Sequence, residues 1–132
     1  MGLDKPYIDV PGTTIFDADQ SRAGYRLNQF CMSLMKAENR ERFLADERGY
    51  LDEWAMTEAQ TQGVIDRDLN ALISLGGNIY MLAKIGASEG LTYLEIVSSM
   101  TDMNVDDYRD MMLSGGRPIE GNRYTHEWDG DK

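Results

Sequence analysis

Apolar residues recur along much of this chain at the spacing of an α-helix. Between positions 24 and 43 they fall three and four residues apart, which places them on one face of a helix. The residues of this stripe are Leu27, Phe30, Cys31, Leu34 and Met35. The spacing then repeats in a second stretch, for which Asn39 is a candidate N-cap, with Phe43, Tyr50, Leu51 and Trp54 as its apolar residues. The pattern predicts one amphipathic helix that runs directly into another.

Capping residues predict where two more helices begin. Asp17 and Thr57 are each followed three residues later by a glutamine, which is the spacing of a capping box. Apolar residues follow Thr57 at helical spacing until the Gly76-Gly77 pair, and glycine is the usual residue just beyond a helix end. We therefore predict a helix that begins at Asp17 and a single helix from Thr57 to the glycine pair.

The second half of the chain predicts shorter elements. Residues 79–85 form an apolar run that ends at Gly86, and this run fits either a helix or a strand. Residues 91–100 have helical spacing. A last helix is predicted to begin at an Asn104 cap and to end at the glycine pair 115–116.

These elements together predict an all-α fold, a single compact helical domain of five to six helices over residues 17–117. No run alternates strictly between apolar and polar residues, as an amphipathic strand would. Pro6 and Pro11 each fix φ and remove a backbone donor, so residues 1–16 are predicted to form an extended N-terminal arm. The apolar side chains of this arm pack either on their own domain or along a partner. Residues 118–132 are predicted to form a polar C-terminal tail.

Composition narrows the class of partner and the compartment. A chain of 132 residues is predicted to form one domain. Its net charge of −10 has the wrong sign for binding nucleic acid phosphates or an anionic membrane surface. The single cysteine, Cys31, excludes an internal disulfide, which fits a reducing cytoplasm. We recognise neither a signal peptide nor an apolar run long enough to span a bilayer, so we expect a cytoplasmic protein without membrane contact.

The histidine content limits the chemistry that this chain can perform. A non-haem Fe(II) oxygenase site needs two histidines and a carboxylate, and a catalytic zinc site usually needs two or three histidines. The sequence contains one histidine, His126, and it lies in the predicted tail. We therefore expect no metal ligand in this chain; a site of three carboxylates, or one completed by a symmetric dimer, is the alternative.

One short motif resembles a catalytic sequence. Residues 86–90 fit the G-x-S-x-G pattern, and Ser88, Asp102 and His126 follow one another in the order of α/β-hydrolases. That chemistry requires a strand-to-helix elbow on a parallel sheet, so that the serine is strained and exposed. A helical chain offers no such sheet, and we interpret the motif as a loop between two helices.

Residues 102–106 resemble the beginning of a calcium-binding loop. The sixth position of such a loop needs glycine and the twelfth a bidentate glutamate, whereas this sequence has Asp107 and Leu113 there. The stretch is better interpreted as the cap and first turn of a helix, where acidic side chains are favoured. Cys31 lies on the apolar stripe, which predicts a buried and unreactive thiol.

Several segments occur together and in the same order as in one known family. They are Pro11-Gly12-Thr13, the stretch 24–43, Tyr50-Leu51-Asp52-Glu53-Trp54, Gly76-Gly77-Asn78-Ile79-Tyr80 and the stretch 108–117. Each is a weak pattern alone, but their colinearity over residues 10–122 is specific. On these segments the chain resembles the small (alpha) subunit of protocatechuate 4,5-dioxygenase, in the class III extradiol ring-cleavage dioxygenase family.

The resemblance implies that the function is shared between two chains. In that family the large (beta) subunit binds Fe(II) through two histidines and a glutamate and supplies the catalytic base. The alpha subunit is a helical lid over the active site in an α2β2 assembly. The reaction inserts both atoms of O2 between carbons 4 and 5 of protocatechuate, a catechol carboxylate. The resemblance therefore implies that this chain is inactive alone, contains no catalytic residue and binds no iron itself.

The resemblance also implies one residue at the substrate. In the family an aromatic side chain before the penultimate helix faces the pocket, and Tyr93 stands at the matching position. Protocatechuate enzymes can have phenylalanine there, so the tyrosine makes gallate a second candidate substrate. The alternative is that Tyr93 only packs at the start of a helix. An aminophenol-type substrate and a helical interaction module without enzymatic activity are the other readings of the chain.

Overall fold

The computed structural model describes residues 5, 8–10 and 13–117, and within them the regular structure is helical, with no strand. The elements are α1 (Ala18–Ala23), α2 (Tyr25–Ser33), α3 (Ala37–Ala45), α4 (Glu47–Leu51), the 3-10 turn η2 (Asp52–Trp54), α5 (Glu58–Ile65), α6 (Leu69–Ser74), α7 (Ile79–Ser88), α8 (Tyr93–Ser98) and α9 (Val105–Leu113). The predicted all-α class is confirmed. The described residues form nine short α-helices, where five to six were predicted, because several predicted helices are interrupted.

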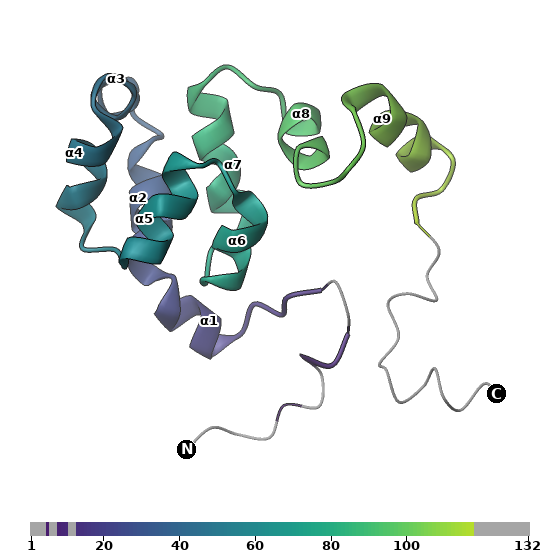
Figure 1. Ribbon diagram of the computed structural model, residues 1–132, viewed down its shortest axis with the longest axis horizontal. Coiled ribbons are helices and arrows are strands. Elements are labelled where there is room, and N and C mark those ends of the chain that lie inside the picture. The colour runs from purple at the N-terminus through teal and green to yellow at the C-terminus, as the bar shows by residue number, and fades with distance from the viewer. Residues whose placement is uncertain (1–4, 6–7, 11–12, 118–132) are drawn as a thin grey trace.

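The helices α1–α7 pack around one another, and α8 and α9 continue from them in a row along one side (Figure 1). Within the packed part, α2 lies against α7, α3 against α4, and α5 against α6. α8 packs on α7, and α9 packs on α8. The pair α3–α4 therefore lies at one end of the molecule and α9 at the other (Figure 1).

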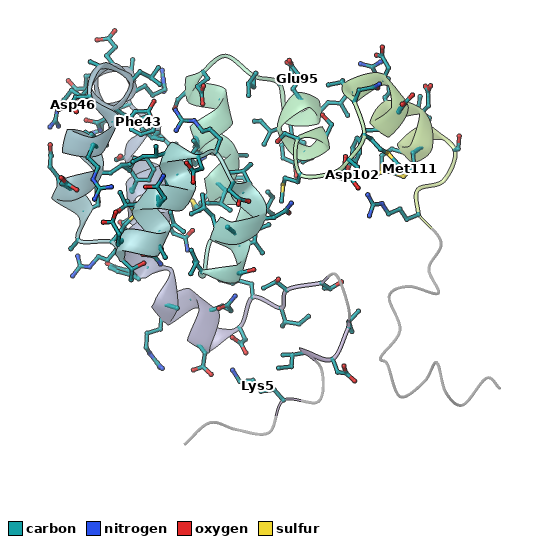
Figure 2. The ribbon with its side chains drawn as sticks, viewed as in Figure 1. Lys5, Phe43, Asp46, Glu95, Asp102 and Met111 are labelled. Atoms are coloured by element: carbon teal, nitrogen blue, oxygen red, sulfur yellow. The ribbon has the colours of Figure 1, made fainter. Side chains whose placement is uncertain are left out.

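Four aromatic side chains form the centre of the packed part, and we call them the aromatic cluster: Phe30, Phe43, Tyr50 and Trp54. The ring centroids of Phe30 and Phe43 lie 5.2 Å apart in an edge-to-face arrangement, and Tyr50 and Trp54 lie 6.0 and 6.4 Å from Phe30. Phe43 points from α3 toward the interior (Figure 2). Such ring pairs contribute roughly 0.5–1.5 kcal/mol each beyond their burial. The cluster joins the two apolar stripes that the sequence predicts.

The predicted helix caps are confirmed at three positions and wrong at one. The side chains of Asp17 and Asn104 accept hydrogen bonds from backbone amides three residues further on, at 3.0 and 2.8 Å. Thr57 forms a complete capping box at the start of α5. Asn39 is not a cap, because α3 has already begun at Ala37, and its side chain donates instead to the carbonyl of Ser33 at 2.9 Å.

The helix predicted over residues 57–76 is divided at Arg67, whose backbone is left-handed (φ 56°). A non-glycine residue in this conformation costs about 1–2 kcal/mol. The guanidinium of Arg67 offsets that cost with two bonds to Glu47, at 2.8 and 2.9 Å, and with an ion pair to Glu89. Asp68 then caps α6. The sequence predicts no break here because no glycine or proline marks it.

Residues 79–85, which fit either a helix or a strand, belong to α7. Gly86 does not end this helix as predicted, since α7 continues to Ser88. A Cβ atom on Gly86 would lie 2.5 Å from Cγ1 of Ile96, so glycine at this position allows α8 to approach α7 closely. The glycine pair 115–116 follows the end of α9, as predicted.

Polar residues of α2 and α3 connect parts of the chain that are distant in sequence. Nδ2 of Asn28 donates to the carbonyl of Gly76 at 3.1 Å, and Oδ1 of Asn28 accepts from the amide of Asn78 at 3.0 Å. The backbones meet so closely here that a Cβ on Gly24 would lie 1.8 Å from the Gly76 oxygen. Arg40 donates to two carbonyls just beyond α2, at 2.8 and 3.1 Å. This polar sequence therefore has a structural role in joining α2 to the turn between α6 and α7 and to α3.

The predicted C-terminal tail, residues 118–132 with His126, lies outside the described residues, as does much of the predicted N-terminal arm. Where the arm is described, Lys5 forms ion pairs with Asp17, at 2.8 Å, and with Asp19. In the part of the chain that the structure describes, none of the helices combines the length and the apolar character that a bilayer span requires.

Candidate functional site

One face of α7 and the start of α8 line an open pocket of about 420 Å³, which we call the α7 pocket. Its lining residues are Ile79, Tyr80, Ala83, Lys84, Ala87 and Tyr93. The first five recur every three or four residues along α7 and therefore share one face of the helix. The other face carries Leu82 and Ile85, which are buried. Thus α7 is apolar on two sides, one covered by its own chain and the other open.

Tyr93 is the first residue of α8, and the structure brings it to the rim of the α7 pocket. The preceding Thr92 forms a capping box with Glu95, in which each side chain accepts a hydrogen bond from the other residue's amide, at 3.1 and 3.0 Å. Hydrogen bonds to the Glu95 carboxylate, from the Thr92 backbone amide first and then from the Thr92 side chain, hold the pKa of Glu95 below its usual value. They fix the point at which the chain turns into α8, so that the Tyr93 side chain stands at the rim with 60% exposed.

Tyr80 and Lys84 stand one helical turn apart on the same wall. Nζ of Lys84 lies 4.6 Å from the centroid of the Tyr80 ring, within the range of a cation–π contact. Tyr80 is 69% exposed, whereas Lys84 is half-buried. No carboxylate among the described residues forms an ion pair with Lys84. The pocket therefore combines two exposed phenols, a short apolar wall and a cation without a counterion from the described chain.

A second hollow, of about 530 Å³, lies next to the α7 pocket and extends to α9. It is lined by Ile79, Val97, Met100, Thr101, Tyr108, Met111, Met112, Gly116 and Arg117. Met111 lies beneath α9, on the side of the loop that carries Asp102 (Figure 2). Helix α9 has no buried residue, and Leu113 at its end is 80% exposed. The open apolar surface therefore continues from α7 to the end of the described chain.

The first three residues of the G-x-S-x-G motif belong to α7, and its last two, residues 89–90, form the turn that follows the helix. Ser88 is the last residue of α7, rather than part of a loop, and its hydroxyl donates to the carbonyl of Lys84 at 2.8 Å. Asp102 lies in the turn after α8, and His126 lies outside the described residues. A serine that ends a helix and bonds to its own helix has neither the strand-to-helix elbow nor the partner that a nucleophile of this type needs.

The calcium-like stretch is the beginning of a helix. Asn104 caps α9, and Asp106 pairs with Arg109 one turn later, at 2.8 Å. The described residues contain no group of three or more His, Cys, Asp or Glu side chains that could hold a metal ion. Cys31 is fully buried, and burial raises the pKa of its thiol to about 12, against a smaller opposing effect of the Lys84 charge. A neutral thiol of this kind is a poor ligand and a poor nucleophile.

Sequence reasoning singled out Tyr93 but missed Tyr80 and Lys84. The sequence does contain a pattern that points to this face, because residues 79–88 are apolar around most of the helix instead of along one stripe. A helix that is apolar on two faces needs a second surface to cover it. This interpretation requires residues 79–88 to be a helix, and from sequence alone the apolar run at 79–85 fitted a strand equally well.

Two comparisons bear on this geometry. Residues 27–113, from α2 to the end of α9, match a family described as "Aromatic-ring-opening dioxygenase LigAB, LigA subunit". The chain is also 30% identical, over 99 residues, to a gallate dioxygenase of Pseudomonas putida KT2440. The aligned region covers 75% of this chain but 29% of that protein, so most of the relative lies outside the match.

Proposed function

The chain belongs to the family of LigA subunits of aromatic-ring-opening dioxygenases, the small subunits of class III extradiol enzymes, and we propose that it covers the active site of a larger, iron-bearing subunit. The reaction we propose is the 4,5-extradiol cleavage of protocatechuate in an α2β2 assembly. Both oxygen atoms of O2 enter the product, one on each carbon of the broken ring bond.

The observation that carries this proposal is the α7 pocket. It is open on one side, and Tyr80 and Tyr93 at its rim are mostly exposed. A surface on the partner subunit would close the pocket and remove these rings from water. Closure of this kind excludes water from the reacting centre and strengthens the electrostatic interactions within it. The role of this chain is then to shape one wall of the substrate site and to keep it dry.

The metal-binding side chains available in this chain fit a function that is shared with an iron-binding partner subunit. Extradiol cleavage in this family depends on iron, and non-haem Fe(II) sites use two histidines and a carboxylate. The chain contains a single histidine, and its described residues contain no cluster of candidate ligands. We therefore assign the Fe(II), which activates O2 and the catechol, to the partner, and substrate positioning at Tyr93 to this chain.

The gallate dioxygenase relative supports the same arrangement. Its region similar to this chain accounts for 29% of its length, so it carries much additional chain on the same polypeptide. We propose that a separate large subunit supplies the corresponding part here. The chain would then act as a detached lid, inactive without its partner.

Gallate is the second candidate substrate, and two observations favour it. The relative is named a gallate dioxygenase. In addition, Tyr93 places a phenol at the pocket rim, where it could bond to an additional ring hydroxyl. Gallate carries one more hydroxyl than protocatechuate, and a site that bonds to this group would favour gallate.

Co-expression with a candidate large subunit tests the proposal. We expect the two chains to co-purify in equal amounts and to consume O2 with protocatechuate or gallate, while this chain alone does neither. The large subunit alone is the control for activity that needs no lid. If the two chains form no complex and consume no O2, the non-enzymatic interaction module becomes the better interpretation.

A further inference from the structure

We propose that Lys84, held against the ring of Tyr80, binds the carboxylate of the aromatic substrate. This inference rests on the proposed function, because it assigns a ligand to the pocket that the lid would close. It adds the residue that binds the carboxylate group, which both candidate substrates carry. The site consists of Lys84 and Tyr80 on α7, opposite the rim residue Tyr93.

The position of Lys84 is fixed by its own helix. Lys84 follows Tyr80 by four residues, so the two side chains lie on one face of α7, with Nζ 4.6 Å from the ring centroid. Lys84 as a whole is half-buried on the same wall. A cation that is held by a ring and lies on a half-buried residue loses less conformational entropy when it binds a ligand than a free surface lysine does.

The charge of Lys84 has no partner among the described residues. Two other half-buried cations do have one, since Lys5 and Arg67 each form an ion pair with a carboxylate. A third, Arg40, instead donates to two backbone carbonyls, whereas no hydrogen bond of this kind within the described chain holds Lys84. The chain as a whole carries a net charge of −10, so carboxylates are abundant, yet none among the described residues pairs with Lys84. When a lid closes, this charge loses part of its water, which is unfavourable unless an anion arrives with it.

The rest of the α7 pocket suits a flat ring. Ala83 and Ala87 lie one turn apart on the wall, and their short side chains leave the space that larger residues would fill. The volume of about 420 Å³ falls within the range of about 300–1,000 Å³ that is usual for small-molecule sites. With the ring against this wall, a carboxylate can meet Lys84 while the ring hydroxyls point toward Tyr93 or across the interface.

A carboxylate of the partner subunit is the alternative occupant. In that case Lys84 would hold the two subunits together and would not distinguish substrates. The two occupants predict different results. Loss of Lys84 would impair recognition of an acid in the first case, and assembly of the complex in the second.

The test uses the assembled enzyme under anaerobic conditions, so that binding is measured without turnover. The dissociation constants of protocatechuate and of its neutral carboxamide are determined for the wild type and for Lys84→Met, Lys84→Arg and Arg22→Met. Lys84→Met removes the charge and keeps the length of the side chain. Arg22→Met removes one positive charge from α1, where Arg22 is exposed, and serves as the matched control.

We expect Lys84→Met to weaken the binding of the acid about ten- to a hundredfold, the usual effect of losing a charge-assisted hydrogen bond. Binding of the carboxamide should change by less than about twofold, because no charge is involved. Lys84→Arg should restore most of the affinity for the acid, and Arg22→Met should leave both constants unchanged. Oxygen uptake with the same pair of ligands should reproduce the acid-to-amide ratio.

Two results would overturn the proposal. An equal loss for acid and amide would mean that Lys84 only packs in the pocket wall, and dissociation of the Lys84→Met complex during gel filtration would assign Lys84 to the partner. Failure of the proposed function would give a different result, because the wild-type assembly would then consume no O2 with protocatechuate or with gallate. That measurement on the wild type comes first, so the two failures are distinguishable.

Discussion

Phe30 and Phe43 are fully buried in the aromatic cluster, whereas Tyr80 and Tyr93 in the α7 pocket expose 69% and 60% of their surfaces. The first set belongs to the centre of the packed helices, and the second lines an open face of α7. Buried apolar area is the main stabilising contribution to folding, and the cluster makes this contribution inside the chain. The apolar area of the rings in the α7 pocket stays exposed and is available for contact with another surface.

This contrast separates residues that fold the chain from residues that await another surface. Scattered apolar side chains are common on protein surfaces, but a continuous set that lines a hollow marks an interaction or ligand site. The set here extends from Tyr80 past Tyr93 to Met112 on α9. Helix α7 forms the boundary, because one of its faces packs on α2 and the other lines the pocket.

The largest expected difference comes from removing one ring from the aromatic cluster and, separately, one ring from the α7 pocket. We expect Phe30→Ala to lower the free energy of unfolding by about 3–5 kcal/mol, because it leaves a cavity among three other rings. Tyr80→Ala should change the free energy of unfolding by less than about 0.5 kcal/mol, since its ring is mostly in water. Urea denaturation of the isolated chain, followed by circular dichroism, measures both values.

Equal losses in the two variants would contradict the distinction between a closed and an open side. A loss in Tyr80→Ala alone would mean that the rim of the pocket, and not the aromatic cluster, holds the helices together. Tyr25→Ala is a further control, because Tyr25 is an exposed ring on α2, away from the pocket.

The second prediction concerns the connection between the two sides. Asn28 bonds to the backbone at Gly76 and Asn78, directly before α7 begins. Asn28→Ala should cost roughly 1–3 kcal/mol of unfolding free energy, because a carbonyl and an amide lose their partner. The adjacent Gln29 is exposed, so Gln29→Ala is a matched amide control and should cost less than about 0.5 kcal/mol. Equal stability of both variants, measured by urea denaturation, would show that the Asn28 bonds do not hold the turn.

These two variants also show what the sequence could predict about the fold. Stripes of apolar residues and side-chain caps are local signals, and they correctly indicated the helical class, three caps and most of the buried residues of the two stripes. Met35, predicted on the first stripe, is 61% exposed, and the contact between the two stripes in the aromatic cluster was not predicted. The role of Asn28 depends on residues about fifty positions away, which no local pattern contains. The break at Arg67 likewise depends on Glu47 and Glu89, so a sequence window around Arg67 predicts a continuous helix.

The residues of the candidate site likewise fall into those that the sequence indicated and those that only the structure reveals. Tyr93 was found through its place in a family pattern, and its position at the α7 pocket is a result of the structure. Lys84 and Tyr80 were missed because their partnership requires residues 79–88 to be helical, which their composition left open. The chemistry that we assign to a partner subunit would depend on residues of another chain.

The third prediction tests the open side by function. In the assembled enzyme, Tyr93→Phe should change the ratio of kcat/KM for gallate over protocatechuate by about three- to tenfold, because it removes one hydrogen bond and keeps the ring. Tyr25→Phe, the same change on an exposed ring of α2, should leave the ratio unaltered. Steady-state oxygen uptake with the two acids provides the ratio. A ratio that Tyr93→Phe leaves unchanged would assign Tyr93 to packing at the start of α8.

The smallest expected effect is the pH dependence of stability caused by the buried Cys31 thiol, which reports whether water reaches the interior between α2 and α7. Cys31 lies on α2, and burial raises the pKa of its thiol to about 12, from an ordinary value near 9. The folded chain therefore keeps this proton as the pH rises through 9, while the unfolded chain releases it, so that stability falls with increasing pH. Between pH 8 and pH 9 the wild type should lose about 0.5 kcal/mol more unfolding free energy than Cys31→Ala, with no such difference between pH 6 and pH 7. Parallel urea titrations of the two chains give this difference, and identical slopes would mean that water reaches α7 from both sides.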